Sequence, residues 1–387
     1  MIRSTIFWIH LVCGVVTGVV VLMMSVTGVL LTYERQILAY AERQGFPIEA
    51  NGAPRMPLEG ILAAARQQRP EFSPATIMVR NEPDAPITLA AGRNGSLFAN
   101  PYTGAVAEPG AEGLHAFFDD MTGWHRWFNV EGEGRGPARA ITGASNLAFL
   151  FLVLSGMYLW LPRVWKWAAF KAHLLFKTKA TTSKARDFNW HHVFGIWSAI
   201  PLAAVVATAT VFSYPWASNL VYRVFGEEPP ARGGGGRGGA QAAPAPIAEW
   251  GQGTGPSVLG LDELFERAAA HGAWRTLTLT LPTDASATTA RFAIDQGNGG
   301  QPHLRHTLTL DATNGSVASY APFSSQTPGQ RARSWVRFLH TGEALGFLGQ
   351  TIAGLVSLTS VLMVWTGIAL AWRRLVSPLF RRRPAAQ

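Results

Sequence analysis

Four histidines occupy positions that suit ligation of a metal inside a membrane. His10 lies in the apolar segment "FWIHLVCGVVTGVVVLMMSVTGVLL", and His191 opens another, "HHVFGIWSAIPLAAVVATATVFSY". His125, in "TGWHRWF", and His340, in "RFLHTGEALGF", each precede a further apolar segment. An ionisable side chain in a bilayer is costly unless it is paired or bound. Because neutral imidazole is a good iron ligand, two imidazoles facing each other across a helix bundle would hold a flat haem from both sides.

The alternative is that these rings have ordinary structural roles. A single histidine at a helix end often reaches the membrane interface or caps a carbonyl, and only its recurrence argues against this. His192 stays open as a substitute for His191, from which it lies about 100° around a helix. Four further histidines match no recurring position and are expected at the surface, at an interface or on a solvated strand: His115, His173, His303 and His306.

Four apolar segments have the length of roughly 20 residues that crosses a bilayer. They are predicted as transmembrane helices over residues 6–33, 141–162, 189–214 and 346–373. Charged residues make up 15% of the 387-residue chain, against roughly 25% in a soluble protein. The first segment is longer than the core of a signal peptide and lacks a cleavage site, so we expect it to be retained.

The placement of charge predicts the orientation of these helices. The net charge is +9, but every lysine falls in the loop of residues 163–188, and arginines follow the last segment in the tail of residues 374–387. By the positive-inside rule, both termini and this loop are expected in the cytoplasm, which in a bacterium would place the chain in the inner membrane. The two long loops, residues 34–140 and 215–345, are then periplasmic. This pattern favours a lipid bilayer over nucleic acid as the partner of the basic residues.

Each long loop reads as a small α+β module. A helix-like stretch, "PLEGILAAARQQRP" or "SVLGLDELFERAAAHG", precedes a hairpin pattern, "PITLAAGRNGSLFANPYTGAV" or "LRHTLTLDATNGSVASY". Residues of about 227–256 are rich in Gly, Pro and Ala and are predicted to be a disordered insert. The single cysteine, Cys13, excludes a disulfide or a C-x-x-C motif within one chain.

These features form an internal repeat of helix, outer module and helix. "HLVCG" and "HHVFG" open the two units, "LSGMYLWLPR" and "WTGIALAWRR" close them, and "NPYTGAV" recurs as "DATNGSV". The fold class expected is an α-helical membrane protein, a four-transmembrane-helix bundle from a duplicated unit with two small periplasmic α+β modules. The predicted topology places His10 and His191 toward the cytoplasmic side, and His125 and His340 toward the periplasmic side.

Five motifs resemble the PepSY-associated transmembrane-helix family of bacterial inner-membrane proteins, which is often described as iron-regulated. They are "WHRWF", "ITGASNLAFLFLVLSGMYLWLPR", "NWHHVFGIWSAIPL", "YPWASNLVYR" and "RFLHTGEALGFLGQTIAG". The outer loops resemble PepSY domains more weakly. The resemblance implies two b-type haems in a four-helix bundle, which siderophore reductases of this kind use to reduce ferric siderophores in the periplasm and release Fe2+. Carried over by motif, His10 and His191 would ligate one haem and His125 and His340 the other.

The function expected is therefore that of a di-haem b oxidoreductase that takes electrons from an unknown donor and reduces a ferric siderophore or another Fe3+ chelate. Arg126 and Arg337 are predicted either to attract haem propionates or an anionic chelate near the second haem, or simply to face water or lipid headgroups. Two alternatives stay open: a non-enzymatic PepSY module that binds or regulates and is anchored in the membrane, and an iron-chelate transporter. No Ser-His-Asp order or HExxH motif indicates acid–base catalysis.

Overall fold

The computed structural model describes residues 1–50, 52–92, 95–163, 165–177, 179–230, 250, 257–284 and 286–380. Most of the insert predicted at about 227–256 lies outside these residues. The chain divides into two compact units. The helical unit comprises Met1–Glu34, Ala116–Val221 and Val336–Gln387, and the sheet unit comprises Arg35–His115 and Tyr222–Trp335.

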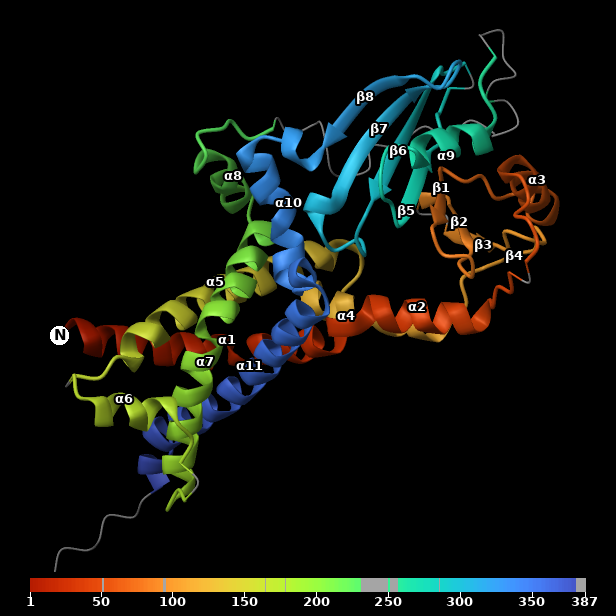
Figure 1. Ribbon diagram of the computed structural model, residues 1–387. Coiled ribbons are helices and arrows are strands. Elements are labelled where there is room, and N and C mark those ends of the chain that lie inside the picture. Colours follow the sequence, from red (N-terminus) through yellow and green to blue (C-terminus); the bar gives the residue numbers. More distant parts are fainter. Residues whose placement is uncertain are drawn as a thin grey trace, which may run out of the picture. The chain divides into compact units, whose positions relative to one another are not determined.

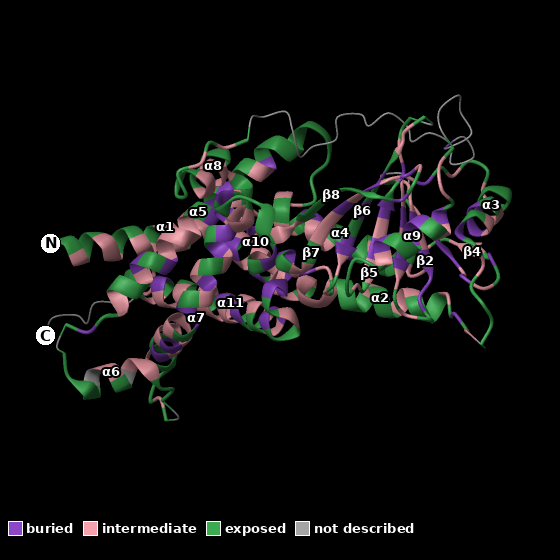
Figure 2. Ribbon diagram, turned by 45° about the horizontal axis from the view of Figure 1, so that its top comes forward, coloured by how far each residue is buried: buried purple, intermediate pink, exposed green. Residues whose placement is uncertain are grey.

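Four long helices build the helical unit (Figure 1). They are α1 (Ile2–Leu30), α5 (Arg135–Trp160), α7 (Ser183–Ser213) and α11 (Gly346–Leu375). All four are long and apolar enough to cross a membrane. Many of their large apolar side chains are exposed, as Figure 2 shows for α1, and such surfaces need lipid around them. The chain is a multi-pass membrane protein, and the prediction of four spanning helices is confirmed.

The spanning helices α5 and α7 begin earlier than their apolar segments, because helical hydrogen bonding continues into the polar flanks. Helix α5 starts at Arg135, before the predicted residue 141. Helix α7 starts at Ser183, where the side chain of Thr182 accepts a hydrogen bond from the backbone N–H of Ala185 at 3.1 Å. A threonine in this place satisfies a donor that the helix itself leaves open.

The four helices close into a bundle in which each contacts two neighbours. Helices α1 and α7 each pack against both α5 and α11. Shorter helices complete the unit: η1 (Leu31–Tyr33), α4 (Glu112–Trp127), η3 (Gly132–Gly134), α6 (Trp167–Leu174), α8 (Pro215–Arg223), α10 (Pro328–Thr341), η7 (Glu343–Leu345) and η8 (Ser377–Phe380). Two of these, α4 and α10, carry His125 and His340.

The sheet unit contains one antiparallel sheet of eight strands in the order β4-β3-β2-β1-β5-β6-β7-β8. The first loop supplies β1 (Thr76–Arg80), β2 (Ile87–Ala90), β3 (Ser96–Ala99) and β4 (Val106–Ala107). The second supplies β5 (Thr276–Thr280), β6 (Thr289–Asp295), β7 (Arg305–Asp311) and β8 (Val317–Pro322). The remaining elements are α2 (Glu34–Gly45), α3 (Leu58–Gln68), α9 (Leu261–Ala269), η5 (Pro302–Leu304) and η6 (Phe323–Ser325).

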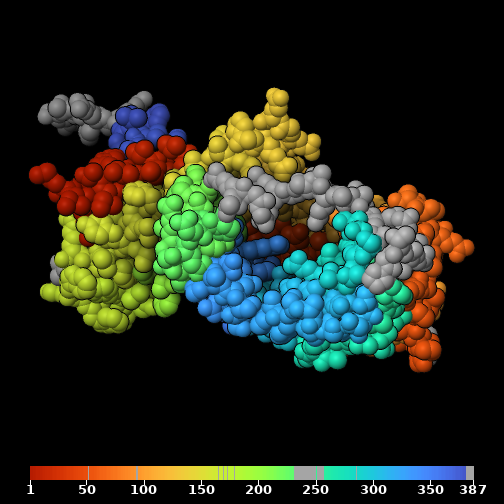
Figure 3. Space-filling view, turned by 90° about the horizontal axis from the view of Figure 1, so that it is seen from above, coloured from red at the N-terminus to blue at the C-terminus, as the bar shows by residue number. Residues whose placement is uncertain are grey.

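The two predicted modules are halves of this single sheet. Each loop supplies a packed helix and antiparallel strands, as expected. The two sets of strands are joined, because β1 pairs with β5 along their full length, from Thr76 opposite Thr280 to Arg80 opposite Thr276. In Figure 3 the orange residues of the first loop lie beside the teal and cyan residues of the second. Two separate modules would each leave the edge of a strand unpaired, and joining those edges satisfies both.

Helices α3 and α9 pack on this sheet in matching ways. Leu62 of α3 and Leu264 of α9 belong to the same buried core as the strands. The Glu59 carboxylate accepts a hydrogen bond from the backbone N–H of Leu261, and the Asp262 carboxylate accepts one from the N–H of Leu58 at 3.0 Å. Each helix thus caps the start of the other. Burial, with the neighbouring Glu59, raises the pKa of Asp262.

Candidate functional site

The helical unit brings the four sequence-predicted histidines together as two pairs. His10 of α1 and His191 of α7, the first pair, line one cavity of about 750 Å³. His125 of α4 and His340 of α10, the second pair, have ring centroids 6.3 Å apart and ring planes inclined at 62°. The chain segments that carry the members of each pair are far apart in the sequence, and helix packing alone unites them.

Each of the four rings is held at Nδ1 by a hydroxyl of a neighbouring helix. For the first pair, His10 Nδ1 lies 2.8 Å from Ser155 Oγ of α5. His191 Nδ1 lies 3.0 Å from Thr366 Oγ1 of α11. A serine or threonine hydroxyl beside an imidazole can accept or donate a hydrogen bond. Which group donates must therefore be inferred from the other contacts of the ring and of the hydroxyl.

The second pair is held in the same manner. His125 Nδ1 lies 3.0 Å from Thr27 Oγ1 of α1, and His340 Nδ1 lies 3.4 Å from Thr208 Oγ1 of α7. His340 Nδ1 also lies 2.9 Å from the backbone carbonyl of Val205. Because a carbonyl can only accept, the proton of neutral His340 is on Nδ1.

The hydroxyls give the same tautomer at the other three rings. Each of the four hydroxyls donates a hydrogen bond to the backbone carbonyl one turn earlier in its own helix. The hydrogen bonds run from Ser155 to Phe151 at 2.6 Å, from Thr366 to Leu362 at 2.8 Å, from Thr27 to Met23 at 2.8 Å and from Thr208 to Ala204 at 2.7 Å. A hydroxyl has one proton, so toward the imidazole it accepts from Nδ1–H. The neutral rings therefore carry a lone pair on Nε2, the atom with which a histidine oriented through Nδ1 binds a metal.

Glycines next to these hydroxyls make room for the rings. A Cβ added at Gly156, after Ser155, would lie 3.4 Å from His10 Cε1, and one at Gly367, after Thr366, would lie 3.3 Å from His191 Cε1. A Cβ at Gly28, after Thr27, would lie 3.5 Å from His125 Cε1. The sequence shows a hydroxyl followed by glycine at all three places, a signal that sequence reasoning missed for Gly156 and Gly367.

Three other glycines of the spanning helices, Gly14, Gly18 and Gly195, lie next to apolar side chains. The nearest atom to an added Cβ belongs to Leu152 for Gly14, to Ile368 for Gly18 and to Met363 for Gly195. These glycines favour close helix packing.

The first cavity has apolar walls and a basic lining at one end. Phe149, Leu152 and Val364 are among its wall residues. Five cationic side chains also line it: Arg3, Arg163, Lys184, Arg373 and Arg374. Its volume lies within the roughly 300–1,000 Å³ of cofactor pockets. Two imidazoles, apolar walls and cations suited to carboxylates together fit a haem, which is flat, apolar and carries two propionates.

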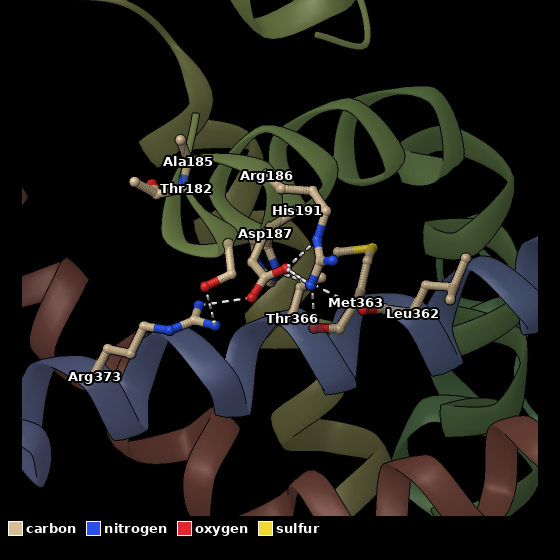
Figure 4. A network of polar contacts seen from close by, with 10 residues as sticks. Thr182, Ala185, Arg186, Asp187, His191, Leu362, Met363, Thr366 and Arg373 are labelled. Atoms are coloured by element: carbon tan, nitrogen blue, oxygen red, sulfur yellow. Dashed lines mark hydrogen bonds and ion pairs between the residues drawn. The ribbon is translucent and has the colours of Figure 1, made fainter. Parts of the chain in front are cut away.

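A buried carboxylate fixes part of this cationic lining (Figure 4). Asp187 of α7 is 1% exposed and lies one turn before His191. It accepts a hydrogen bond from Arg373 of α11 at 2.6 Å and one from Arg186 at 3.0 Å. The pair Asp187–Arg373 ties α7 to α11 beside the first histidine pair. Sequence reasoning missed it, although a lone carboxylate at the start of an apolar helix could have indicated it.

The two arginines predicted for the second pair lie at the surface next to aromatic rings. Arg126 and Arg337 are both exposed. The guanidinium of Arg126 lies 4.8 Å from the ring centre of Trp127, and that of Arg337 lies 5.9 Å from the ring centre of Phe338. The first cavity has its own cationic side chains that suit the propionates of a haem.

Five of the six remaining histidines separate into two groups. His115 pairs with Glu42 at 2.9 Å, His303 stacks on Trp335, and His306 stacks on Tyr320, all within the sheet unit. His173 and His192 line the first cavity. His192 Nδ1 donates to the carbonyl of Phe188 at 2.8 Å, so its Nε2 also carries a lone pair. His191 shares the hydroxyl contact of His10, which favours it over His192.

Among the residues that the structure describes, no three His, Cys, Asp or Glu side chains gather as a metal site. The sequence of residues 7–374 matches the family model of the PepSY-associated TM region. The chain belongs to this family. A search of curated proteins finds no match to the chain.

In this PepSY-associated transmembrane protein the two histidine pairs lie at different levels of the bundle. Thr27 and Thr208 contact the second pair, His125 and His340. Thr27 follows His10 along α1 at the same separation in sequence as Thr208 follows His191 along α7. At 1.5 Å per residue, this separation spans about 25 Å of helix axis. Leu202 and Val206 of α7 lie between the two levels and pack in a buried apolar cluster.

Proposed function

We propose that the chain is a haem b protein of the bacterial inner membrane that moves electrons from the cytoplasmic to the periplasmic side and reduces a ferric siderophore or a similar Fe3+ chelate, releasing Fe2+. His10 and His191 would hold one haem, and His125 and His340 the other. The observation that carries this proposal is the arrangement of four imidazoles, each oriented through Nδ1 toward a hydroxyl or carbonyl and grouped in two pairs at two levels of the bundle.

The spacing of the second pair supports bis-histidine ligation. A nitrogen ligand lies about 2 Å from its metal, and the centre of an imidazole lies roughly 1 Å farther out. Two rings on opposite faces of a haem would thus have centres about 6 Å apart. The centroids of His125 and His340 are 6.3 Å apart.

When bound, haem supplies one-electron exchange, and the protein sets its orientation and surroundings. Ser155 and Thr366 hold the first two rings in one tautomer and increase the basicity of Nε2 by accepting from Nδ1–H. The apolar walls exclude water, and Arg3, Arg373 and Arg374 supply positive charge for the propionates. Reduction weakens a siderophore complex because Fe(II) is a poorer match for hard oxygen ligands.

Charge placement supports the orientation in this proposal. The lysine-rich residues 163–188, which contain α6, join α5 to α7, and Arg373 and Arg374 end α11. The termini and this loop would face the cytoplasm, and the sheet unit would face the periplasm. The corresponding pairs Ser155–Gly156 and Thr366–Gly367, together with the reciprocal caps of α3 and α9, support a duplicated unit.

The test is the spectrum and reactivity of the purified full-length protein from haem-replete cells. We expect two haem b per chain with a low-spin bis-histidine spectrum. After reduction with dithionite and removal of the excess, addition of a ferric siderophore should reoxidise the haems and release Fe2+ to a ferrous-specific chelator. A colourless protein would contradict the whole proposal and favour the anchored binding module. Haems that a ferric chelate leaves reduced would contradict the substrate alone.

A further inference from the structure

The first cavity is also lined by an aromatic group that the two proposed haem ligands do not account for. It consists of Trp160 at the end of α5, His173 of α6, and Phe188 and His192 of α7. The ring centroids of His173 and His192 lie 4.8 Å apart, and those of Phe188 and His192 lie 4.1 Å apart. Trp160 adjoins His173 with centroids 6.1 Å apart. We call these four residues the aromatic arm of the cavity.

Two polar atoms of the aromatic arm are buried without a hydrogen-bond partner among the described residues. They are Trp160 Nε1 and His173 Nδ1. A buried donor or acceptor that lacks a partner costs free energy, so native proteins rarely keep one without a ligand or water to satisfy it. The indole N–H can only donate, whereas an imidazole nitrogen can accept. A ligand for this arm therefore needs an oxygen that accepts from the indole N–H, and a hydroxyl can bond to either tautomer of His173.

The aromatic arm adjoins an element with the character of the membrane interface. Trp167 begins α6 and is 75% exposed, as is Trp165 just before it. Exposed tryptophans beside spanning helices typically lie at the level of the lipid headgroups. Helix α6 packs against α7, which carries His192 and Phe188. A ligand dissolved in the bilayer would meet the aromatic arm at this level.

We propose that the aromatic arm binds the headgroup of a membrane quinol. A hydroquinone is flat and aromatic, and its hydroxyl oxygens both accept and donate, which matches Trp160 Nε1–H and His173 Nδ1. The inference rests on the proposed function, since this quinol would be the electron donor for the first histidine pair. Oxidation of one hydroquinone yields one quinone, two protons that pass to water, and two electrons, which reduce two ferric chelates to the ferrous state.

The competing occupant of these polar atoms is a propionate of the proposed haem. The test measures equilibrium binding of decylubiquinone to the full-length protein in lipid nanodiscs, together with haem content, in wild type and in Trp160→Phe and His173→Leu. Trp160→Phe keeps an aromatic ring and removes only the N–H, and Trp165→Phe is the matched control outside the arm. We expect Trp160→Phe and His173→Leu each to weaken quinone binding at least tenfold while both haems stay. Trp165→Phe should bind as wild type does.

Three outcomes would overturn the proposal: wild type that does not bind decylubiquinone, binding that Trp160→Phe leaves unchanged, or loss of a haem from Trp160→Phe. The last result would assign the two polar atoms to the haem. Reoxidation of dithionite-reduced protein by a ferric siderophore bypasses the quinol and should persist in Trp160→Phe. Failure of that reaction in wild type would contradict the proposed function, whereas loss of quinone binding alone concerns only the donor.

Discussion

The two halves of the chain, residues 2–160 and 183–375, place the same groups at corresponding positions but surround them differently. Each half contributes a histidine near the start of its first helix and a hydroxyl followed by glycine near the end of its last. Only the second half has Asp187 and His192, and the corresponding positions in the first half are Ile6 and Leu11. The shared groups are those that orient the imidazoles. Both differences lie at the first cavity, where the second half alone supplies the Asp187–Arg373 ion pair and His192 of the aromatic arm.

The largest effect that tests this comparison is the loss of one haem when the proposed ligand of either half is replaced. We expect His10→Ala and His191→Ala to lose the same haem and to keep the other, because the two rings line one cavity. His192→Ala is the control and should keep both. Haem content and the α band of the reduced protein measure the outcome. Loss from His192→Ala with retention in His191→Ala would assign the ligand to His192.

The next effect concerns the ion pair found only in the second half. Asp187→Ala removes the buried acceptor of Arg373, whose own side chain is 28% exposed, and losing a hydrogen bond between charged groups costs about 1.5–3 kcal/mol. We expect the helical unit to unfold at a clearly lower temperature, measured by circular dichroism of the full-length protein in detergent. Arg186→Gln removes the more exposed partner of Asp187 and should cost far less. Equal effects of the two changes would show that the burial of the Asp187–Arg373 pair contributes little.

A smaller and symmetrical effect is expected from the hydroxyls. Ser155→Ala and Thr366→Ala should each weaken binding of the first haem about 10–100-fold, the usual cost of losing a group that orients a metal ligand. Ser155→Thr keeps a hydroxyl and is the control for the first half, as Thr366→Ser is for the second. Haem transfer to an apo-haem acceptor measures the affinity. A large loss in one half alone would contradict equivalent roles for the two residues.

The smallest effect lies in the sheet unit, where Glu59 and Asp262 cap each other's helices. Glu59→Ala and Asp262→Ala should each destabilise their region by about 1 kcal/mol, seen as faster hydrogen exchange in α3 and α9. Asp262→Asn keeps an acceptor and should cost less. Unequal losses in Glu59→Ala and Asp262→Ala would show that the reciprocal caps are not equivalent.

The raised pKa of Asp262 gives the sign of a pH effect. Because folding favours the protonated form, its stabilising contribution is complete below the unfolded pKa of about 3.9. That contribution is lost as the pH rises through the folded value. Asp262→Asn should remove this dependence, and hydrogen exchange measured across this pH window in both proteins would reveal it. An unchanged pH profile would contradict the role of Asp262.

Sequence reasoning reached the spanning helices and the family, and both are confirmed. The pairing of His10 with His191 and of His125 with His340 also came from the repeat, and their role as haem ligands stays a prediction. It missed the hydroxyls of Ser155, Thr366, Thr27 and Thr208, since serines and threonines are common in membrane helices and only their neighbours in space distinguish these four. Two modules were expected in place of one sheet because the sequence of β1 carries no sign that its free edge pairs with β5.

The sequence by itself determined what depends on local composition: which segments are apolar enough to span a bilayer, where basic residues gather, and which groups recur in both halves. Only the tertiary structure decided which side chains from distant segments meet, including the hydroxyl next to each imidazole and the ion pair of Asp187 with Arg373. It also showed that two buried ring nitrogens of the aromatic arm have no hydrogen-bond partner among the described residues. The physical reason is that helical periodicity fixes the face on which a residue lies, whereas the partner opposite that face depends on how all four helices pack at once.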